Sequence, residues 1–222
     1  MNIILFGPPG SGKGTQGEQL AQRLRLPLLT MSRAIRAAIQ AGALSHDMLK
    51  RMNEGLLLPD SEVWQCLSRV IEGPDYHKGV ILDGYPRTIA QANSMIDHSF
   101  KLDHVVFLDV SDALLVERLS GRRVEPYSGR VYQLTTNPPK QPGIDDVSGL
   151  PLIQRDDDKP EVVSRRLVVY RKESKPLIAW FEEKQATKQI GAVHMIDASG
   201  DIGMVHQAIM DAIHKNSTHR SV

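Results

Sequence analysis

The stretch Gly7-Pro8-Pro9-Gly10-Ser11-Gly12-Lys13-Gly14-Thr15 decides the fold of this chain. It follows a short apolar run, residues 3–6, and opens a segment with the apolar spacing of a helix, residues 13–24. A buried strand, a glycine-rich loop and a helix in this order make a G-x-x-x-x-G-K match credible. The glycines let successive backbone N–H groups point inward, while the helix N-terminus and Lys13 add positive charge. The stretch therefore predicts a loop that binds a polyphosphate.

The residue after the lysine narrows this prediction. The usual motif places Ser or Thr there, where its hydroxyl meets a metal ion. Here Gly14 follows Lys13 and the hydroxyl comes one residue later, on Thr15. The resulting G-K-G-T resembles the nucleoside monophosphate kinases more than GTPases or motor ATPases.

Length and composition limit the classes of protein to which the chain can belong. The 222 residues suit one substantial core with small insertions, and 41% hydrophobic with 24% charged residues is ordinary for a soluble globular protein. Twenty-seven basic residues nearly balance 26 acidic ones, so bulk charge indicates neither a nucleic-acid partner nor a membrane surface. We therefore expect neither partner.

The single cysteine, Cys66, lies in an apolar helical pattern. It excludes a disulfide framework and a cysteine-rich zinc site, and we expect it to be a buried core thiol. No apolar run approaches the roughly 20 residues of a membrane span, and no secretory signal is visible. We expect a cytoplasmic protein.

Short apolar runs alternate with longer helical patterns along the chain. Continuously apolar strands separated by helices indicate a parallel sheet that is covered on both faces. We therefore predict an α/β fold, a three-layer P-loop NTPase-type core with a five-stranded parallel sheet. Strands are expected at residues 3–6, 27–29, 80–82, 105–108 and 193–196, and helices at 13–24, 33–41, 60–72, 88–97, 111–120, 160–184 and 202–214.

Two regions interrupt this core. Residues 30–58 join the second and third strands with small helices, and residues 121–158 are rich in proline turns and contain a hairpin signal around residues 126–130. We expect the first to be a small insertion and the second a small lid. The core then comprises residues 1–29, 59–120 and 159–214, and residues 215–222 form a flexible tail.

A second motif follows the third predicted strand. Asp83 ends that strand, where a carboxylate can hold Mg²⁺ or its waters beside phosphates. Gly84 allows close approach of a ligand, and Arg87 offers a planar fork for a phosphate. Gln91, four residues further on, can read the edge of a base through its amide.

Together the motifs resemble the adenylate kinase family in its long-lid form, from residue 1 to about residue 200. The resemblance rests on G-x-P-G-x-G-K-G-T, on L-D-G-Y-P-R-T with its glutamine, and on four later segments. These segments are Gly121-Arg122-Arg123, Ser128-Gly129-Arg130-Val131-Tyr132, Asn137-Pro138-Pro139-Lys140 and Arg155-Asp156-Asp157-Asp158.

The resemblance implies the roles of individual residues. Phosphoryl transfer between two nucleotides gathers negative charge, so the protein must position the nucleotides and neutralise that charge with cations from several directions. The implied catalytic cations are Lys13, Arg36, Arg87, Arg122, Arg155 and Arg166. The implied ATP site comprises Gly10, Ser11, Gly12, Lys13, Gly14, Thr15, Arg118, Arg122, Val131, Tyr132 and Gly200. The implied AMP site comprises Met31, Arg36, Leu56, Leu57, Leu58, Gly84, Tyr85, Pro86, Arg87, Gln91, Arg155 and Arg166. Asp157 and Asp158 match carboxylates that hold the arginines when the lid closes.

The chain departs from the family pattern in the lid and in the first insertion. Where many long-lid relatives carry cysteine-type zinc ligands, the positions here are Glu125, Ser128, Asp145 and Ser148. Oxygen-bearing side chains suit a lid core held by hydrogen bonds, so we predict no structural zinc. In the insertion, residues 30–33 read Thr-Met-Ser-Arg. Here Met31 replaces a hydroxyl near the acceptor base, and Arg33 puts a positive charge where the family has an acidic residue. The sequence therefore does not decide which base the acceptor carries.

The resulting expectation is a monomeric kinase that reversibly converts Mg·ATP and AMP into two ADP. Two alternatives remain: a kinase for another monophosphate such as UMP or CMP, and a catalytically weak nucleotide-binding regulator. Rates with different acceptors decide the first alternative. The complete set of six cations argues against the second.

Overall fold

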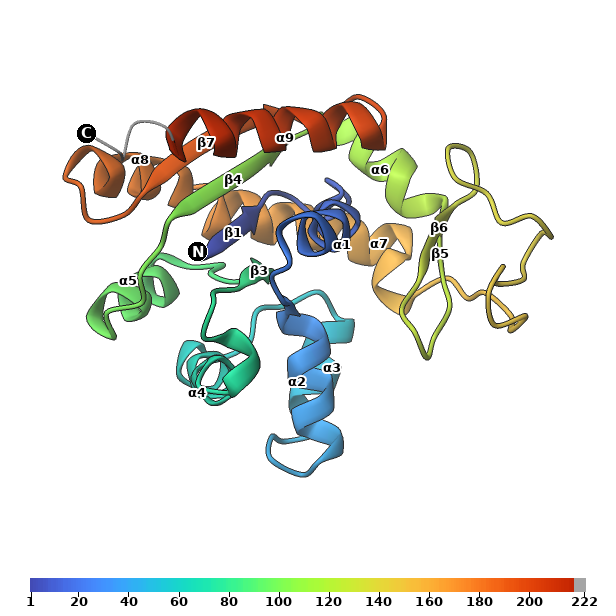
Figure 1. Ribbon diagram of the computed structural model, residues 1–222. Helices are drawn as coiled ribbons and strands as arrows, with labels where there is room; N and C mark the ends of the chain where they lie inside the picture. Colours follow the sequence, from blue (N-terminus) through green and yellow to red (C-terminus); the bar gives the residue numbers. More distant parts are fainter. Residues whose placement is uncertain (218–222) are drawn as a thin grey trace.

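The computed structural model describes residues 1–217, and a five-stranded parallel sheet forms its centre (Figure 1). The strands lie in the order β2-β3-β1-β4-β7. Their bounds are β1 Ile3–Phe6, β2 Leu28–Thr30, β3 Ile81–Asp83, β4 His104–Asp109 and β7 Ala192–Asp197. The prediction of a parallel five-stranded sheet in an α/β fold is confirmed.

Helices cover both faces of the sheet because alternate residues of each strand point to opposite sides. Ile4 and Phe6 of β1 belong to one hydrophobic cluster, and Ile3 and Leu5 belong to another. The first cluster takes in α2 (Met31–Gln40), α3 (Asp47–Asn53), α4 (Asp60–Ile71), α5 (Ile89–Asp97) and α8 (Leu177–Ala186). The second takes in α1 (Lys13–Leu24), α6 (Asp112–Ser120), α7 (Pro160–Val169) and α9 (Ile202–Ser217).

Two segments extend from this three-layer core (Figure 1). Residues 30–58, called the insertion below, carry α2 and α3 and lie below the sheet in that view. Residues 121–158, called the lid segment, carry the antiparallel pair β5 (Arg122–Val124) and β6 (Val131–Gln133) and the short helix η2 (Asp156–Asp158). The hairpin lies where the turn signal predicted it. A further short helix, η1 (Pro74–Tyr76), precedes β3.

The structure corrects the expected helices at three places. Helix α2 begins at Met31 rather than at Arg33, directly after β2, because Met31 is only 1% exposed and packs into the core. The long helix expected over residues 160–184 is divided into α7, a π-helical turn η3 (Tyr170–Ser174) and α8. Helix α9 continues to Ser217, into the stretch expected to be a flexible tail. The remaining tail residues, 218–222, lie outside the described residues.

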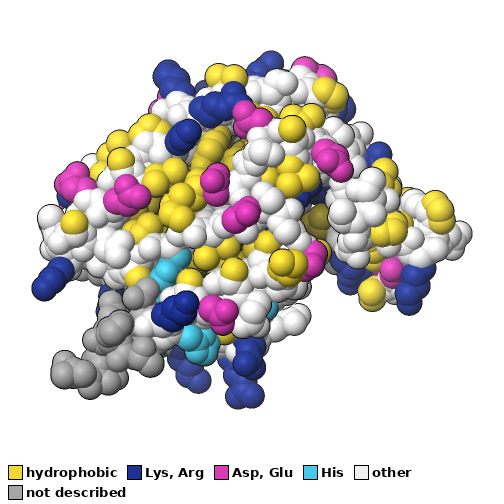
Figure 2. Space-filling view, turned by 90° about the horizontal axis from the view of Figure 1, so that it is seen from above, with side chains coloured by type: hydrophobic (Ala, Val, Ile, Leu, Met, Phe, Trp, Pro, Cys, Tyr) yellow, Lys and Arg dark blue, Asp and Glu magenta, His cyan; other side chains and the backbone are white. Residues whose placement is uncertain are grey.

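The surface shows little segregation of charge on the face seen from above α9. There, basic and acidic side chains alternate with hydrophobic ones (Figure 2). Among the helices of residues 1–217, none combines the length and apolar character needed to cross a membrane.

Candidate active site

The glycine-rich loop joins the C-terminal end of β1 to the start of α1. Gly12 caps this helix with a φ of +97°, a left-handed conformation that residues with side chains seldom adopt. The Lys13 ammonium donates to the carbonyl oxygens of Gly7 and Pro8 at 2.9 and 2.8 Å. Burial lowers the pKa of Lys13 to about 8, and the charge of Asp83 opposes that shift. The loop thus holds a partly desolvated cation at the edge of the sheet where ligands of parallel α/β folds bind.

Asp83 lies beside this loop because β3 is the neighbour of β1, and its backbone pairs in register with Leu5. Its side chain is nearly buried, since the residue is 9% exposed. Mg²⁺ is usually held by one or two carboxylates, with phosphates and waters completing its shell. A single carboxylate beside a phosphate loop fits that ion. Within residues 1–217, no group of three or more His, Cys, Asp or Glu is placed to hold a metal by protein ligands alone.

Arg87 lies in the loop between β3 and α5, and its side chain is exposed. Gly84 has a φ of +85°, and a Cβ there would lie 3.0 Å from a terminal nitrogen of Arg87. The Arg87 Nε donates to the carbonyl oxygen of Gly84 at 2.9 Å. Desolvation by the surrounding protein lowers the pKa of the guanidinium, and the charge of Asp83 opposes that shift. The left-handed φ and the close approach of Arg87 both favour glycine at position 84.

Gln91 is placed differently from the base-reading residue expected from the sequence. It is 2% exposed, its Oε1 accepts from the Arg87 backbone N–H at 2.7 Å, and its Nε2 donates to Asp60 Oδ1 at 2.8 Å. Asp60 also accepts from the Thr88 hydroxyl at 3.1 Å, and that hydroxyl caps α5. Each polar atom of the amide therefore already has a protein partner. A base contact remains a prediction and needs the second N–H or lone pair of the same amide.

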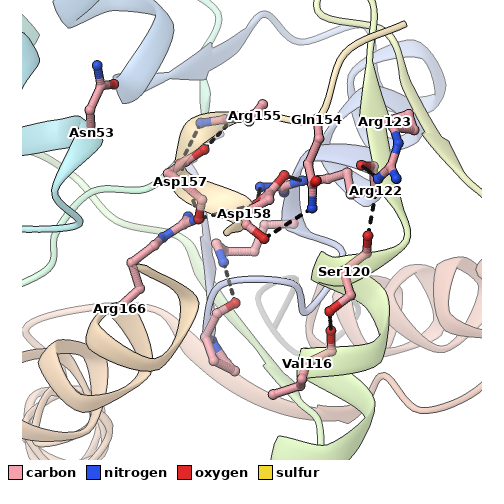
Figure 3. A network of polar contacts seen from close by, with 12 residues as sticks. Asn53, Val116, Ser120, Arg122, Arg123, Gln154, Arg155, Asp157, Asp158 and Arg166 are labelled. Atoms are coloured by element: carbon pink, nitrogen blue, oxygen red, sulfur yellow. Dashed lines mark hydrogen bonds and ion pairs between the residues drawn. The ribbon is translucent and has the colours of Figure 1, made fainter. Parts of the chain in front are cut away.

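Three arginines gather around two buried aspartates at the end of the lid segment (Figure 3). Arg122 binds both oxygens of Asp158 at 2.7 and 2.5 Å, and Arg155 binds both oxygens of Asp157 at 2.7 and 2.8 Å. Arg166, from α7, reaches Asp157 at 3.1 Å and Asp158 at 3.5 Å. The three cations therefore share two carboxylates and carry one excess positive charge.

The pKa values in this cluster follow from burial and from the neighbouring charges. Burial lowers the pKa of Arg166 to about 10, against the attraction of Asp157. Burial alone would raise the pKa of Asp157, but Arg166 and Arg155 overcome that effect and hold it below its usual value. Asp157 and Arg166 therefore face each other as an ion pair at neutral pH.

The insertion approaches the same cluster. Arg36 donates to Asn53 Oδ1 at 3.2 Å, and burial lowers its pKa, with Arg155 as the next cause. Glu54 accepts from Arg165 through its carbonyl oxygen at 3.0 Å, which fixes the end of α3 against α7. Leu56, Leu57 and Leu58 follow as a half-buried stretch, where Leu57 accepts from Arg51.

Two residues of the insertion that depart from the family pattern lie at different places. Met31 is buried in the sheet-side cluster together with Ile35, so it contributes to the core. Arg33 is exposed, lies 3.6 Å from Glu18 and donates to the carbonyl oxygen of Gly129 at 3.3 Å. Arg33 therefore links the insertion to the hairpin of the lid segment.

On the donor side, the loop after β7 meets α6. Arg118 lies 3.4 Å from the carbonyl oxygens of Ser199 and Gly200, next to the expected adenine site. Val131 is exposed on the hairpin. Tyr132, the other expected lid contact, is buried and donates through its hydroxyl to Asp145 at 3.0 Å. The Tyr132 side chain therefore belongs to the interior of the lid segment.

Hydrogen bonds hold that interior together. Asp145 accepts from Arg130 at 2.5 Å, from the Ser148 N–H at 2.6 Å and from the Ser148 hydroxyl at 2.9 Å. Glu125 accepts from the backbone N–H groups of Tyr127 and Ser128 at 3.0 and 2.6 Å. The hydrogen-bonded lid core expected from the oxygen-bearing side chains is therefore present.

The structure also adds residues that sequence reasoning missed. Asn53, Asp60 and Ser174 contact Arg36, Gln91 and Arg87, respectively. In the sequence, Asp60 after Pro59 indicated only the start of a helix. Ser174 carried no signal because its place depends on the π-helical turn.

A family model described as adenylate kinase matches residues 5–186, which include the loop, Asp83, Arg87 and the arginine cluster. The chain belongs to the adenylate kinase family. Membership supports a kinase that transfers a phosphoryl group to a nucleoside monophosphate, on a P-loop fold that binds nucleotides. The five-stranded parallel sheet agrees with that fold.

Proposed function

We propose that this chain is an adenylate kinase: it transfers the γ-phosphoryl group of Mg·ATP reversibly to AMP, giving two ADP. The observation that carries the proposal is a convergence of cations. Lys13 of the loop lies close enough to Arg87, Arg166 and Arg122 for all three charges to lower its pKa. These cations come from four separate segments of the chain. Like charges gathered in one cleft suit a ligand that carries several negative charges, as two facing nucleotides do.

The cations divide between donor and acceptor by position. Lys13 and the loop N–H groups hold the β- and γ-phosphates, and Arg122 approaches from the lid side. Arg87 and Arg36 lie on the insertion side and hold the acceptor phosphate. Arg155 and Arg166 lie between the two and neutralise the group in transit. We propose that the insertion, the lid segment and the core act as separate domains that close around both nucleotides.

The chemical step needs little covalent help from the protein. An oxygen of the acceptor phosphate attacks the γ-phosphorus while the bond from that phosphorus to the β-bridging oxygen breaks, and ADP leaves. The arginines and Lys13 stabilise the charge that spreads over the transferred group. Asp83 would hold Mg²⁺, which neutralises part of the phosphate charge when bound. Closure of the lid segment keeps water from taking the place of the acceptor.

The proposed acceptor base is adenine. The family membership and Gln91 favour AMP, while the buried Met31 supplies no hydroxyl to a base. We also propose a monomer that acts in the cytoplasm. The single, buried cysteine suits such a reducing compartment.

An acceptor panel tests the proposal. Initial rates are measured at fixed Mg·ATP with AMP, UMP, CMP and GMP, and AMP is expected to have the highest kcat/KM by a wide margin. A better rate with UMP or CMP would reassign the chain to a kinase of that monophosphate. Lys13→Ala is expected to lower kcat by roughly two to three orders of magnitude. Turnover like that of the wild type in this variant would contradict the mechanism.

A further inference from the structure

Buried side chains hold the backbone of Arg87 at both its N–H and its carbonyl oxygen. Its N–H donates to Gln91 Oε1 at 2.7 Å, and its carbonyl oxygen accepts from the Ser174 hydroxyl at 2.8 Å. Ser174 is 4% exposed and lies 87 residues further along the chain. The Arg87 side chain, by contrast, is exposed, and its Nε donates to the carbonyl oxygen of Gly84. The backbone of Arg87 is thus fixed while its charge stays available.

Ser174 reaches Arg87 because a π-helical turn, Tyr170–Ser174, stands between α7 and α8. The N–H of Lys175 donates to the carbonyl oxygen of Tyr170 at 2.8 Å, which closes the wide turn. One extra residue in a turn rotates all later side chains by about 100° around the helix axis. Such turns are rare and occur often at functional sites. In an uninterrupted helix the Ser174 hydroxyl would point elsewhere.

The elements on both sides of Ser174 are firmly packed. Leu177 and Phe181 of α8 are fully buried against the sheet. Arg166 lies two turns earlier, on α7, and belongs to the arginine cluster. The same helical run therefore presents one cation to the site directly and holds a second cation through a backbone hydrogen bond.

We propose that Ser174 is a positioning residue for the acceptor phosphate: its hydroxyl fixes the carbonyl of Arg87 and so aims the guanidinium. This inference rests on the proposed function, in which Arg87 binds that phosphate. Without the hydroxyl, the Arg87 carbonyl loses its partner and the loop after β3 gains freedom. Acceptor binding must then restore that order, which weakens it. The hydroxyl of Ser174 donates to Arg87 rather than to the loop of residues 7–15, so donor binding should be unaffected.

The test compares Ser174→Ala with the wild-type enzyme in steady-state kinetics. The KM for AMP is measured at saturating Mg·ATP, and the KM for ATP is measured at saturating AMP. Loss of one hydrogen bond should raise the acceptor KM roughly three- to tenfold. The donor KM should stay within about twofold of its wild-type value, since no donor contact changes. Equal rises of both constants, or no rise at all, would overturn the proposal.

Two further variants separate positioning from a general structural role. Ser174→Thr keeps the hydroxyl and is expected to keep the acceptor KM low. Ser164→Ala removes a similar hydroxyl on α7, which donates to the carbonyl oxygen of Pro160 at 3.0 Å and not to Arg87. This variant should behave as the wild type. If Ser174→Ala is unstable, Ser174→Cys, with a weaker donor of similar size, replaces it and is expected to show the same KM split.

A double-mutant cycle with Arg87→Ala shows through which residue Ser174 acts. If Ser174 works through Arg87, adding Ser174→Ala to the Arg87→Ala variant should leave the acceptor KM at the value of Arg87→Ala alone. Independent, multiplying effects would contradict the proposal. The cycle also separates the two claims. An Arg87→Ala variant with a wild-type acceptor KM refutes the proposed acceptor site. A large effect of Arg87→Ala with none of Ser174→Ala refutes only the positioning role.

Discussion

Arg122 and Asp158 form a two-point ion pair, with distances of 2.7 and 2.5 Å between the guanidinium nitrogens and both carboxylate oxygens. The Asp158 side chain is completely buried, and it comes from the last turn of the lid segment, 36 residues after Arg122. The pair therefore ties the first strand of that segment to its end.

Replacing this carboxylate should weaken the fold. Asp158→Asn leaves Arg122 and Arg166 with less compensating charge, and breaking a buried pair costs about 3–5 kcal/mol of unfolding free energy. Urea unfolding followed by tryptophan fluorescence measures the loss. Asp156→Asn is the matched control, because Asp156 pairs with Lys159 on the open surface and should change stability by less than about 0.5 kcal/mol. Equal stabilities of the two variants would show that the cluster carries no such energy.

Binding of Mg·ATP should take up protons near pH 8. The pKa of Lys13 is lowered to about 8 in the empty site, and bound phosphates favour the charged ammonium and raise that pKa. Between the two pKa values the complex holds more protons than the free protein, so affinity falls as the pH rises above about 8. Calorimetry at pH 8.5 in buffers of different ionisation enthalpy measures the uptake.

Arginine at the same position provides the control for that measurement. Lys13→Arg keeps a cation that does not titrate in this range, so the proton uptake should disappear. An equal uptake in the Lys13→Arg variant would assign the proton to another group.

The lid segment should open locally when its central carboxylate is removed. Asp145 accepts from Arg130, Tyr132 and Ser148, so Asp145→Ala leaves these donors without their shared partner. Limited proteolysis within residues 121–158 should accelerate roughly tenfold, while the unfolding midpoint of the core changes little. Val147→Ala, two residues further along the chain at a side chain that is 74% exposed, should keep the wild-type cleavage rate. Unchanged proteolysis of the Asp145 variant would count against a lid core held by this network.

The single thiol should be protected in the native protein. Cys66 is 8% exposed on α4, and burial raises the pKa of its thiol, which disfavours the reactive thiolate. Reaction with a thiol reagent at pH 8 should be at least about 100-fold slower than that of free cysteine, and unfolding by denaturant should restore the rate. Labelling as fast as free cysteine would mean that α4 opens readily.

The sequence predicted the fold through local patterns that tertiary packing does not alter. Continuously apolar runs, separated by helical patterns, predicted a parallel sheet covered on both faces. Cys66 lies in the core, as its helical pattern indicated. Each of these features depends on periodicity or on backbone freedom, which are local properties of the chain.

Features that depend on distant partners were missed. Nothing local distinguishes a serine at position 174 from a surface serine, because its role arises from a π-helical turn and from the place of Arg87. The burial of Met31 in the core depends on the packing of α2 against the sheet, which its local sequence did not indicate. Arg33 contacts the Gly129 carbonyl oxygen in the lid segment, a meeting of two regions that no local pattern shows.

The central claim is reversible transfer between adenine nucleotides, and ³¹P NMR of the reaction mixture tests it most directly. With catalytic amounts of the protein and Mg²⁺, an equimolar mixture of ATP and AMP should yield the two phosphorus signals of ADP without inorganic phosphate. ADP alone should yield ATP and AMP, and the two mixtures should reach the same final composition. Release of inorganic phosphate from ATP, or no ADP from ATP and AMP, would contradict the account.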